Sequence, residues 1–297
     1  MKTNNRSSFI IFPILILIGY LVALAGSQGG ATLGGVPIFA LAVGLIFLIQ
    51  WLAFIPAYWM QTEKFYDLTG SLTYITVTGV AVCYSRYSVD LDARSILLAA
   101  LVIIWALRLG TFLFSRIQKA GKDDRFDEIK PSFIRFLNAW TIQALWVTFT
   151  AAAALVAITT TTRKELDAFA IVGLLIWLFG FVFEVIADSQ KSRFSADPSN
   201  KGKFIRSGLW SRSRHPNYFG EIVLWIGVAV IAIPVLQGWT WVALISPLFV
   251  TLLLTRVSGV PLLEKKADKK WGGQADYEEY KKNTPVLIPR LLKKGKS

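Results

Sequence analysis

Residues 36–59, VPIFALAVGLIFLIQWLAFIPAYW, decide the fold class, because this stretch contains no Asp, Glu, Lys or Arg. A helix of about 20 mostly apolar residues crosses the hydrocarbon core of a bilayer. Comparable apolar stretches occur at 9–25, 68–84, 95–115, 138–158, 167–187, 219–236 and 239–258, and the signal is weakest at 68–84 and 219–236. The sequence therefore predicts an all-α, polytopic transmembrane helical bundle of about seven or eight spans.

The composition of the whole chain agrees with an integral membrane protein. Of its 297 residues, 54% are hydrophobic and 17% are charged, whereas soluble domains carry nearer a quarter of charged residues. There is no internal repeat or low-complexity linker, so one domain over 1–297 is expected. The first apolar run ends with Ala23-Leu24-Ala25 and follows Lys2 and Arg6, a pattern that also suits a signal peptide. Because the run is long for a signal core, a retained first helix is preferred.

The distribution of positive charge predicts the orientation. The net charge is +13. With eight spans and a cytoplasmic N-terminus, the inner segments carry 27 Lys and Arg residues, the outer loops carry 4, and Arg108 lies inside a span. This asymmetry follows the positive-inside rule and places both termini in the cytoplasm, at a bacterial inner membrane or an endoplasmic reticulum membrane. Many lysines are expected to meet anionic membrane lipids. Nucleic acid is not expected, because the basic residues are tied to span ends.

Several kinds of site are excluded by the residue inventory. The chain has one cysteine, Cys83, and one histidine, His215, so it has no internal disulfide and no Cys/His zinc site, and no metal is expected. No Gly-x-Ser-x-Gly, Gly-x-Gly-x-x-Gly or phosphate-loop motif is present. A nucleotide would therefore bind without the soluble folds that usually hold it.

Polar residues interrupt the apolar pattern in five places. The clusters are Glu63–Asp67, Arg108 with Arg116, Gly121–Asp127, Glu184–Lys191 and Ser213–Glu221. A charge at the centre of a membrane helix costs on the order of 2.5–3.5 kcal/mol on insertion scales, so Arg108 must face a partner or a wet cavity. One alternative is an ion pair of Arg108 with Glu184 or Asp188 that only fixes helix packing. Taken together, the clusters favour one shared pocket, which the cytoplasmic loops and the C-terminal tail would close.

The content of this pocket fits a phosphorylated nucleotide. The cations are Arg108, Arg116, Arg125, Lys191, Arg193, Arg212 and Arg214. The acceptors are Glu184, Asp188, Asn217 and Glu221, and the rings are Trp210, Tyr218, Phe219 and Tyr280. Guanidinium groups suit phosphates, carboxylates and amides suit ribose hydroxyls, and rings offer flat surfaces. Pro216 suits the first turn of a helix, whose free N–H groups favour an anion.

At these residues the chain resembles the membrane steroid 5-alpha-reductase-like reductases, most closely their bacterial-type branch of unknown function. It is more distantly similar to sterol C14 reductases and to isoprenylcysteine carboxyl methyltransferases. The resemblance covers 63–290, the family core, and leaves 1–60 as less certain N-terminal spans. It rests on Trp105–Arg108, Lys122–Arg125, Ala187–Lys191, Phe194, Gly208–Trp210, Arg214–Glu221, Tyr277–Tyr280 and Pro285–Pro289.

The resemblance implies NADPH-dependent reduction of a carbon–carbon double bond conjugated to a carbonyl, in a lipophilic small-molecule substrate. The implied cofactor-binding residues are Arg108, Arg116, Asp124, Arg125, Glu184, Asp188, Lys191, Lys203, Arg214, His215, Asn217, Tyr218, Glu221 and Tyr280. In steroid reductases a glutamate and a tyrosine hold the ketone. Glu63 matches the glutamate, whereas Trp105 stands at the tyrosine position and cannot act as an acid, so Tyr66 is the substitute donor.

Two alternatives remain open on the sequence. A membrane methyltransferase would bind S-adenosylmethionine in the same C-terminal half, where Glu264 and Tyr277 supply acidic and aromatic side chains. Arg108, Arg116 and Arg125 would then have no phosphates to meet. A non-enzymatic lipid-binding protein would keep the same fold.

Overall fold

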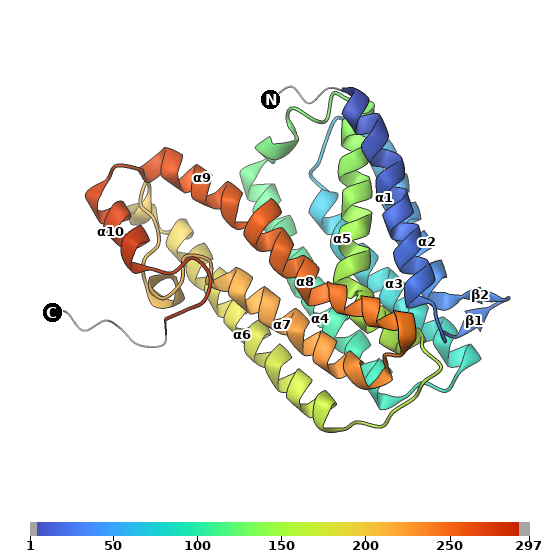
Figure 1. The fold of residues 1–297 in the computed structure, drawn as a ribbon. Helices are drawn as coiled ribbons and strands as arrows, with labels where there is room; N and C mark the ends of the chain where they lie inside the picture. The colour runs from blue at the N-terminus through green and yellow to red at the C-terminus, as the bar shows by residue number, and fades with distance from the viewer. Residues whose placement is uncertain (1–4, 291–297) are drawn as a thin grey trace. The chain divides into compact units, whose positions relative to one another are not determined.

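The computed structural model describes residues 5–290, and these fold almost entirely as helices (Figure 1). They form two compact units. The first unit comprises the described residues up to Ile171 together with Val228–Ser246, and the second comprises Val172–Gly227 together with the described residues from Pro247. The expected all-α bundle is confirmed, and the single-domain assignment stays a prediction.

The first unit is built around one central helix. Its helices are α1 (Asn5–Gly26), α2 (Ile38–Trp59), α3 (Tyr66–Ser88), α4 (Ala93–Ala120) and α5 (Phe133–Thr159). Helix α5 contacts the other four and is almost completely buried. The run Ala151–Ala154 is buried within it, and such small side chains let neighbouring backbones approach closely in membrane bundles.

A short hairpin, absent from the sequence prediction, joins α1 to α2. Strand β1 (Thr32–Leu33) pairs antiparallel with β2 (Val36–Pro37). Gly34 and Gly35 form the turn with φ values of 57° and 83°. Two successive residues with positive φ characterise a type I′ hairpin turn, and glycine adopts this geometry at little cost.

A buried arginine anchors the loops at the same end of the first unit as the hairpin. Arg94 is 1% exposed, forms an ion pair with Asp167 at 3.0 Å, and donates to the carbonyls of Glu165 and Ile231 at 2.7 Å. The planar guanidinium presents five N–H donors to these acceptors, whereas a lysine ammonium has three. This one side chain therefore fixes the start of α4 to the loop before α6 and to the last turn of α7.

The remaining long helices are α6 (Ala168–Ala196), α7 (Pro216–Ala232), α8 (Ile245–Leu252), α9 (Val260–Trp271) and α10 (Ala275–Asn283). Short 3-10 turns occupy Asp124–Phe126, Pro198–Asn200, Gly208–Ser211, Ile233–Val235 and Gly238–Leu244, and a π-helical turn occupies Leu253–Val257.

Glycines bring the backbones of α6 and α7 into direct contact within the second unit. A Cβ atom on Gly220 would lie 2.7 Å from the backbone N of Glu184 and 2.7 Å from the carbonyl of Gly180. A Cβ on Gly180 would in turn lie 2.5 Å from the backbone N of Leu224. Gly227, seven residues after Gly220, meets α6 in the same way. This close crossing fixes Glu184 beside the first turn of α7.

Seven segments of the described chain are long and apolar enough to cross a membrane: Ser7–Gly26, Ile38–Trp59, Ala93–Gln118, Phe133–Thr159, Ala168–Ala196, Pro216–Val235 and Gly238–Trp271. The expected span at 68–84 is helical, as α3, but is not among them. Its polar residues Thr73, Thr78 and Ser85 are fully buried in the unit, so α3 keeps its polar groups inside the protein. The expected helix at 239–258 is divided into the 3-10 turn, α8 and the π-helical turn.

Candidate functional site

A cavity of about 290 Å³ lies within the second unit, next to the segment that holds the only histidine. Its walls come from the end of α6, the loop 203–215, α9 and α10. Five of the predicted cofactor-binding residues line it: Lys191, Lys203, Arg214, His215 and Tyr280. The structure therefore brings these five residues together around one cavity, and their role in cofactor binding stays a prediction.

Glu264 on α9 contributes a carboxylate to the lining of this cavity. One carboxylate oxygen, Oε2, pairs with Nη1 of Arg214 at 2.5 Å, and the other, Oε1, lies 2.8 Å from Nε2 of His215. The ring of Tyr218 stacks on that of His215, with centroids 5.6 Å apart. The carboxylate thus holds two consecutive residues of the 214–217 segment in fixed orientations.

Backbone pairing positions the same segment from the other side. The N–H groups of Arg214 and His215 donate to the carbonyls of Pro285 and Val286 at 2.9 and 3.1 Å. The hydroxyl of Ser213, which is fully buried, donates to Leu287 at 2.8 Å. The described part of the C-terminal tail therefore lies along the motif, and its expected closure of a cofactor pocket stays a prediction. Residues 291–297 lie outside the described residues.

Three buried polar atoms of this segment have no hydrogen-bond partner among the described residues: Nε of Arg214, Nδ1 of His215 and Oδ1 of Asn217. Buried polar groups are normally hydrogen-bonded, so each exception requires an explanation. Three exceptions within four residues, beside a cavity, indicate a polar ligand that supplies both acceptors and donors.

His215 is neutral near pH 7. Burial lowers its pKa below the ordinary value, although the hydrogen bond to Glu264 acts in the opposite direction. Arg214 already balances the charge of Glu264. Because a carboxylate only accepts, the neutral ring donates its Nε2–H to Glu264 and presents Nδ1 as an acceptor.

The neutral state of His215 predicts a pH effect on stability. Its pKa is about 6.5 after unfolding and lower in the folded protein, so the unfolded chain binds the proton more readily. The contribution to stability is complete above about pH 6.5 and is lost as the pH falls toward the folded pKa. In melting curves recorded between about pH 5 and pH 8, the wild type should lose stability more steeply with acid than His215→Gln. Parallel curves would contradict a neutral His215.

Aromatic side chains form the rest of the cavity wall. Phe204 contacts Trp271, Tyr277 and Tyr280, with ring centroids 5.8, 5.2 and 5.4 Å apart. The hydroxyl of Tyr280 donates to the carbonyl of Trp210 at 2.7 Å, and burial raises the pKa of Tyr280. This hydroxyl therefore stays protonated and holds α10 against the loop.

Helix α6 contributes the buried acids Glu184 and Asp188, which are 2% and 5% exposed. The ammonium of Lys191, one turn further along, lies 4.6 Å from the ring centroid of Trp210. Glu221 is half-buried on the first turns of α7. These residues are placed by the glycine contacts between α6 and α7, and their expected role in cofactor binding stays a prediction.

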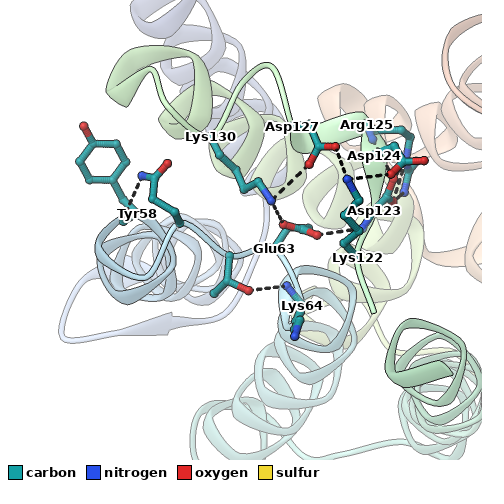
Figure 2. Close-up of polar contacts among 11 residues, drawn as sticks. Tyr58, Glu63, Lys64, Lys122, Asp123, Asp124, Arg125, Asp127 and Lys130 are labelled. Carbon is teal, nitrogen blue, oxygen red and sulfur yellow. Dashed lines mark hydrogen bonds and ion pairs between the residues drawn. The ribbon is translucent and has the colours of Figure 1, made fainter. Parts of the chain in front are cut away.

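The predicted catalytic glutamate lies in the first unit, in an ion-pair network (Figure 2). Glu63 is 4% exposed. Its Oε1 accepts from the backbone N–H of Asp123 at 2.8 Å, and its Oε2 pairs with Nζ of Lys130 at 2.5 Å. Lys122 pairs with Asp127 at 2.7 Å in the same loop. In this structure Glu63 therefore fixes the loop between α4 and α5.

The other two predicted catalytic residues are also held by the protein. The hydroxyl of Tyr66 donates to the carbonyl of Ala139 at 2.8 Å. Trp105 is 2% exposed, and its ring meets that of Tyr74 edge to face, with centroids 5.1 Å apart.

The first-unit arginines of the predicted cofactor site are more accessible. The guanidinium of Arg108 lies 5.4 Å from the ring centroid of Phe112. The exposed side chain of Arg116 lies 3.9 Å from Asp67. Arg125 pairs with Asp123 at 2.5 Å, next to the exposed Asp124. The convergence of these residues with those of the second unit stays a prediction.

Sequence reasoning did not assign Phe204, Lys266, Lys270 and Trp271 to the site, and it assigned Glu264 only to the methyltransferase alternative. The spacing of residues on α9 contains a signal that could have assigned those of them that lie on this helix. The cavity-lining residues of α9 are Leu263, Glu264, Lys266, Ala267, Lys270 and Trp271, and this spacing describes one face of a helix.

Comparison with known proteins identifies the family. The model described as "Protein of unknown function (DUF1295)" matches residues 53–284. The chain belongs to this family. The match includes the Glu63 loop and almost all of the cavity walls, and with the seven apolar segments it describes an integral membrane protein.

Curated relatives of this DUF1295 chain are named as steroid reductases. "3-oxo-5-alpha-steroid 4-dehydrogenase 1" of Rattus norvegicus is 30% identical over 121 residues, 40% of this chain and 41% of the relative. "Steroid 5-alpha-reductase DET2" of Gossypium hirsutum is 31% identical over 117 residues, 39% and 40% of the two chains. The matched region spans about two fifths of these relatives. The expected steroid 5-alpha-reductase-like relationship is confirmed.

A shorter part of the chain matches a relative that is named as a probable methyltransferase. "Probable O-methyltransferase ustE" of Ustilaginoidea virens is 36% identical over 58 residues, which are 20% of each chain. No solved structure matches the chain.

Proposed function

We propose that this protein is an NADPH-dependent reductase of a carbon–carbon double bond conjugated to a carbonyl, in a lipophilic, steroid-like substrate. The observation that carries the proposal is the second-unit cavity, where the lining residues Arg214 and His215 have buried polar atoms without partners among the described residues, as does Asn217 two residues further along the chain. The names of the curated relatives support the same reaction class.

The residues present fit this cofactor. Nε of Arg214 is a charged donor for a phosphate oxygen, whereas Nδ1 of His215 and Oδ1 of Asn217 accept from ribose hydroxyls or an amide. Phe204 and Trp271 add half-buried rings at the cavity wall. When bound, NADPH supplies the hydride for the beta carbon of the substrate.

The residues that would act on the substrate are Glu63 and Tyr66. A donor aimed at the carbonyl oxygen stabilises the negative charge that develops there. The hydroxyl of Tyr66 donates a hydrogen bond to the carbonyl of Ala139, and Glu63 is paired with Lys130. Each residue must therefore exchange its present partner before it can donate to a carbonyl.

We also propose that α3 crosses the membrane as an eighth span, so that the loops carrying these residues and both termini face the cytoplasm. The excess of Lys and Arg in the segments that contain Arg125 and Arg214 supports this orientation. It would expose the cofactor site to the compartment that contains NADPH.

The second candidate, an S-adenosylmethionine-dependent methyltransferase, is favoured by two specific observations. Glu264 holds Arg214 and His215 in the centre of the cavity, and a probable O-methyltransferase matches 58 residues of the chain. A carboxylate suits the cationic centre of S-adenosylmethionine. Against this candidate, the cavity contains several lysines, for which this cofactor has no phosphate.

Ligand-induced thermal stabilisation of the detergent-solubilised protein tests the proposal. NADPH at about 100 times its Kd should raise the free energy of unfolding by about 2.7 kcal/mol, and S-adenosylmethionine should have no effect. Asn217→Ala should abolish most of the NADPH shift, because it removes a buried acceptor. Asn283→Ala, which changes an exposed residue at the end of α10, should retain it.

The remaining outcomes separate the candidates. A shift with S-adenosylmethionine alone would replace the reductase by the methyltransferase. A shift with neither compound would favour a lipid-binding protein without enzymatic activity. Normal NADPH binding by Asn217→Ala would show that the cofactor lies elsewhere.

A further inference from the structure

The cavity of the second unit has an excess of positive charge. Its single lining carboxylate, Glu264, is already paired with Arg214 and His215. Within residues 5–290, no carboxylate lies within ion-pair distance of Lys203, Lys266 or Lys270, although all three line the cavity. Asp197 acts on Lys203 only at longer range. Three ammonium groups around one cavity, none of them ion-paired, attract an anion of high charge.

The fold places these three lysines at one end of the cavity. Lys266 and Lys270 are four residues apart on α9 and therefore share a face of the helix. Nε1 of Trp271 donates to the carbonyl of Gly202 at 2.6 Å. This bond ties the residue before Lys203 to the end of α9, next to Lys270.

A ring wall lies beside the lysines. Phe204 follows Lys203 directly and contacts Trp271 at 5.8 Å between ring centroids. Phe204 and Trp271 are half-buried and line the cavity. Ammonium groups bind phosphate as point charges, and a phosphate monoester carries about −1.5 to −2 charges at pH 7. Cations beside flat rings match a purine ring whose ribose carries a phosphate monoester.

We propose that Lys203, Lys266 and Lys270 bind the 2′-phosphate of NADPH, and that they thereby select NADPH over NADH. This inference rests on the proposed reductase function. It assigns a selectivity role to α9, a helix that lies outside the sequence motif around His215.

The test compares two double variants of α9 that change the net charge equally. Lys266→Met/Lys270→Met removes the cavity-facing charges and keeps much of the aliphatic stems. Lys265→Met/Lys269→Met removes two exposed lysines that do not line the cavity. The binding constants of NADPH and NADH are measured for each detergent-solubilised protein by titration calorimetry.

The wild type should bind NADPH more tightly than NADH. In Lys266→Met/Lys270→Met, NADPH affinity should fall about tenfold, because each partly exposed ion pair contributes modestly, and NADH affinity should stay unchanged. Lys265→Met/Lys269→Met should behave as the wild type. The preference should also weaken as salt is raised, since exposed charges are screened.

Three results would overturn the inference. The wild type could bind both dinucleotides equally, which would leave the reductase proposal intact. The cavity-facing variant could keep its preference for NADPH. The two variants could lose NADPH affinity equally, which would indicate the net charge of the protein rather than contacts with the 2′-phosphate. Failure of the wild type to bind either dinucleotide would instead remove the proposed function itself.

Discussion

Replacing Gly220 with leucine should prevent α6 and α7 from packing and should lower the free energy of unfolding by about 3 kcal/mol or more. Even the Cβ atom would lie 2.7 Å from the backbone of Gly180 and of Glu184. Both neighbours are backbone atoms, so neither can rotate away. The melting temperature of the detergent-solubilised protein measures the effect.

Gly44→Leu is the matched control for this substitution. Gly44 lies on α2, is exposed, and has no atom within 4 Å of a Cβ position. Leucine has the higher helix propensity, by about 0.8 kcal/mol, so this variant should be as stable as the wild type or slightly more so. Equal losses in the two variants would show that the α6–α7 contact is not as close as described.

Replacing Lys130 with glutamine should produce the second large effect, a loss of about 3 kcal/mol in the free energy of unfolding. The side chain of Glu63 is 2% exposed, and without the ammonium its charge would keep only the hydrogen bond from the N–H of Asp123 among the described residues. A buried charge that loses its partner is strongly destabilising. Thermal melting of the purified variant gives the measurement.

Two further variants separate this pair from ordinary surface charge. Lys122→Gln removes a similar contact with Asp127, but both side chains are well exposed, so its melting temperature should stay close to that of the wild type. Glu63→Gln/Lys130→Gln removes both charges and should recover most of the lost stability. A double variant as unstable as Lys130→Gln would show that the ion pair is not the cause.

The membrane helices could be predicted well because hydropathy alone specifies them. The charge-free run within 36–59 became α2, with bounds Ile38–Trp59. The positions at which a regular α-helix is interrupted were harder to predict from the sequence. The apolar pattern of 239–258 contains no acidic residue, yet Gln237 and Thr240 cap each other's backbone and start a 3-10 turn there. A local side-chain hydrogen bond of this kind leaves no trace in a hydropathy profile.

The candidate site was predicted in part. The segment Arg214–Asn217 was recognisable because polar residues at the start of an apolar helix are costly without a ligand. The role of Glu264 as partner of both Arg214 and His215 was not, because α9 is 49 residues distant from His215 in sequence and its lysines resemble an ordinary solvated face. Tertiary contacts, rather than local pattern, decide which face of such a helix is functional.

The glycine crossing has a consequence for motion. Backbone atoms of α6 and α7 touch at Gly180 and Gly220, so neither helix can slide or rotate against the other without a collision. The two helices therefore form a rigid pair within the second unit. The cavity walls from α9 and α10 are joined to the loop 203–215 by side chains such as Glu264 and Tyr280 and by backbone bonds to the tail after α10. If a bulky ligand enters by movement of these C-terminal helices, its rate of exchange should depend on how fast these contacts open.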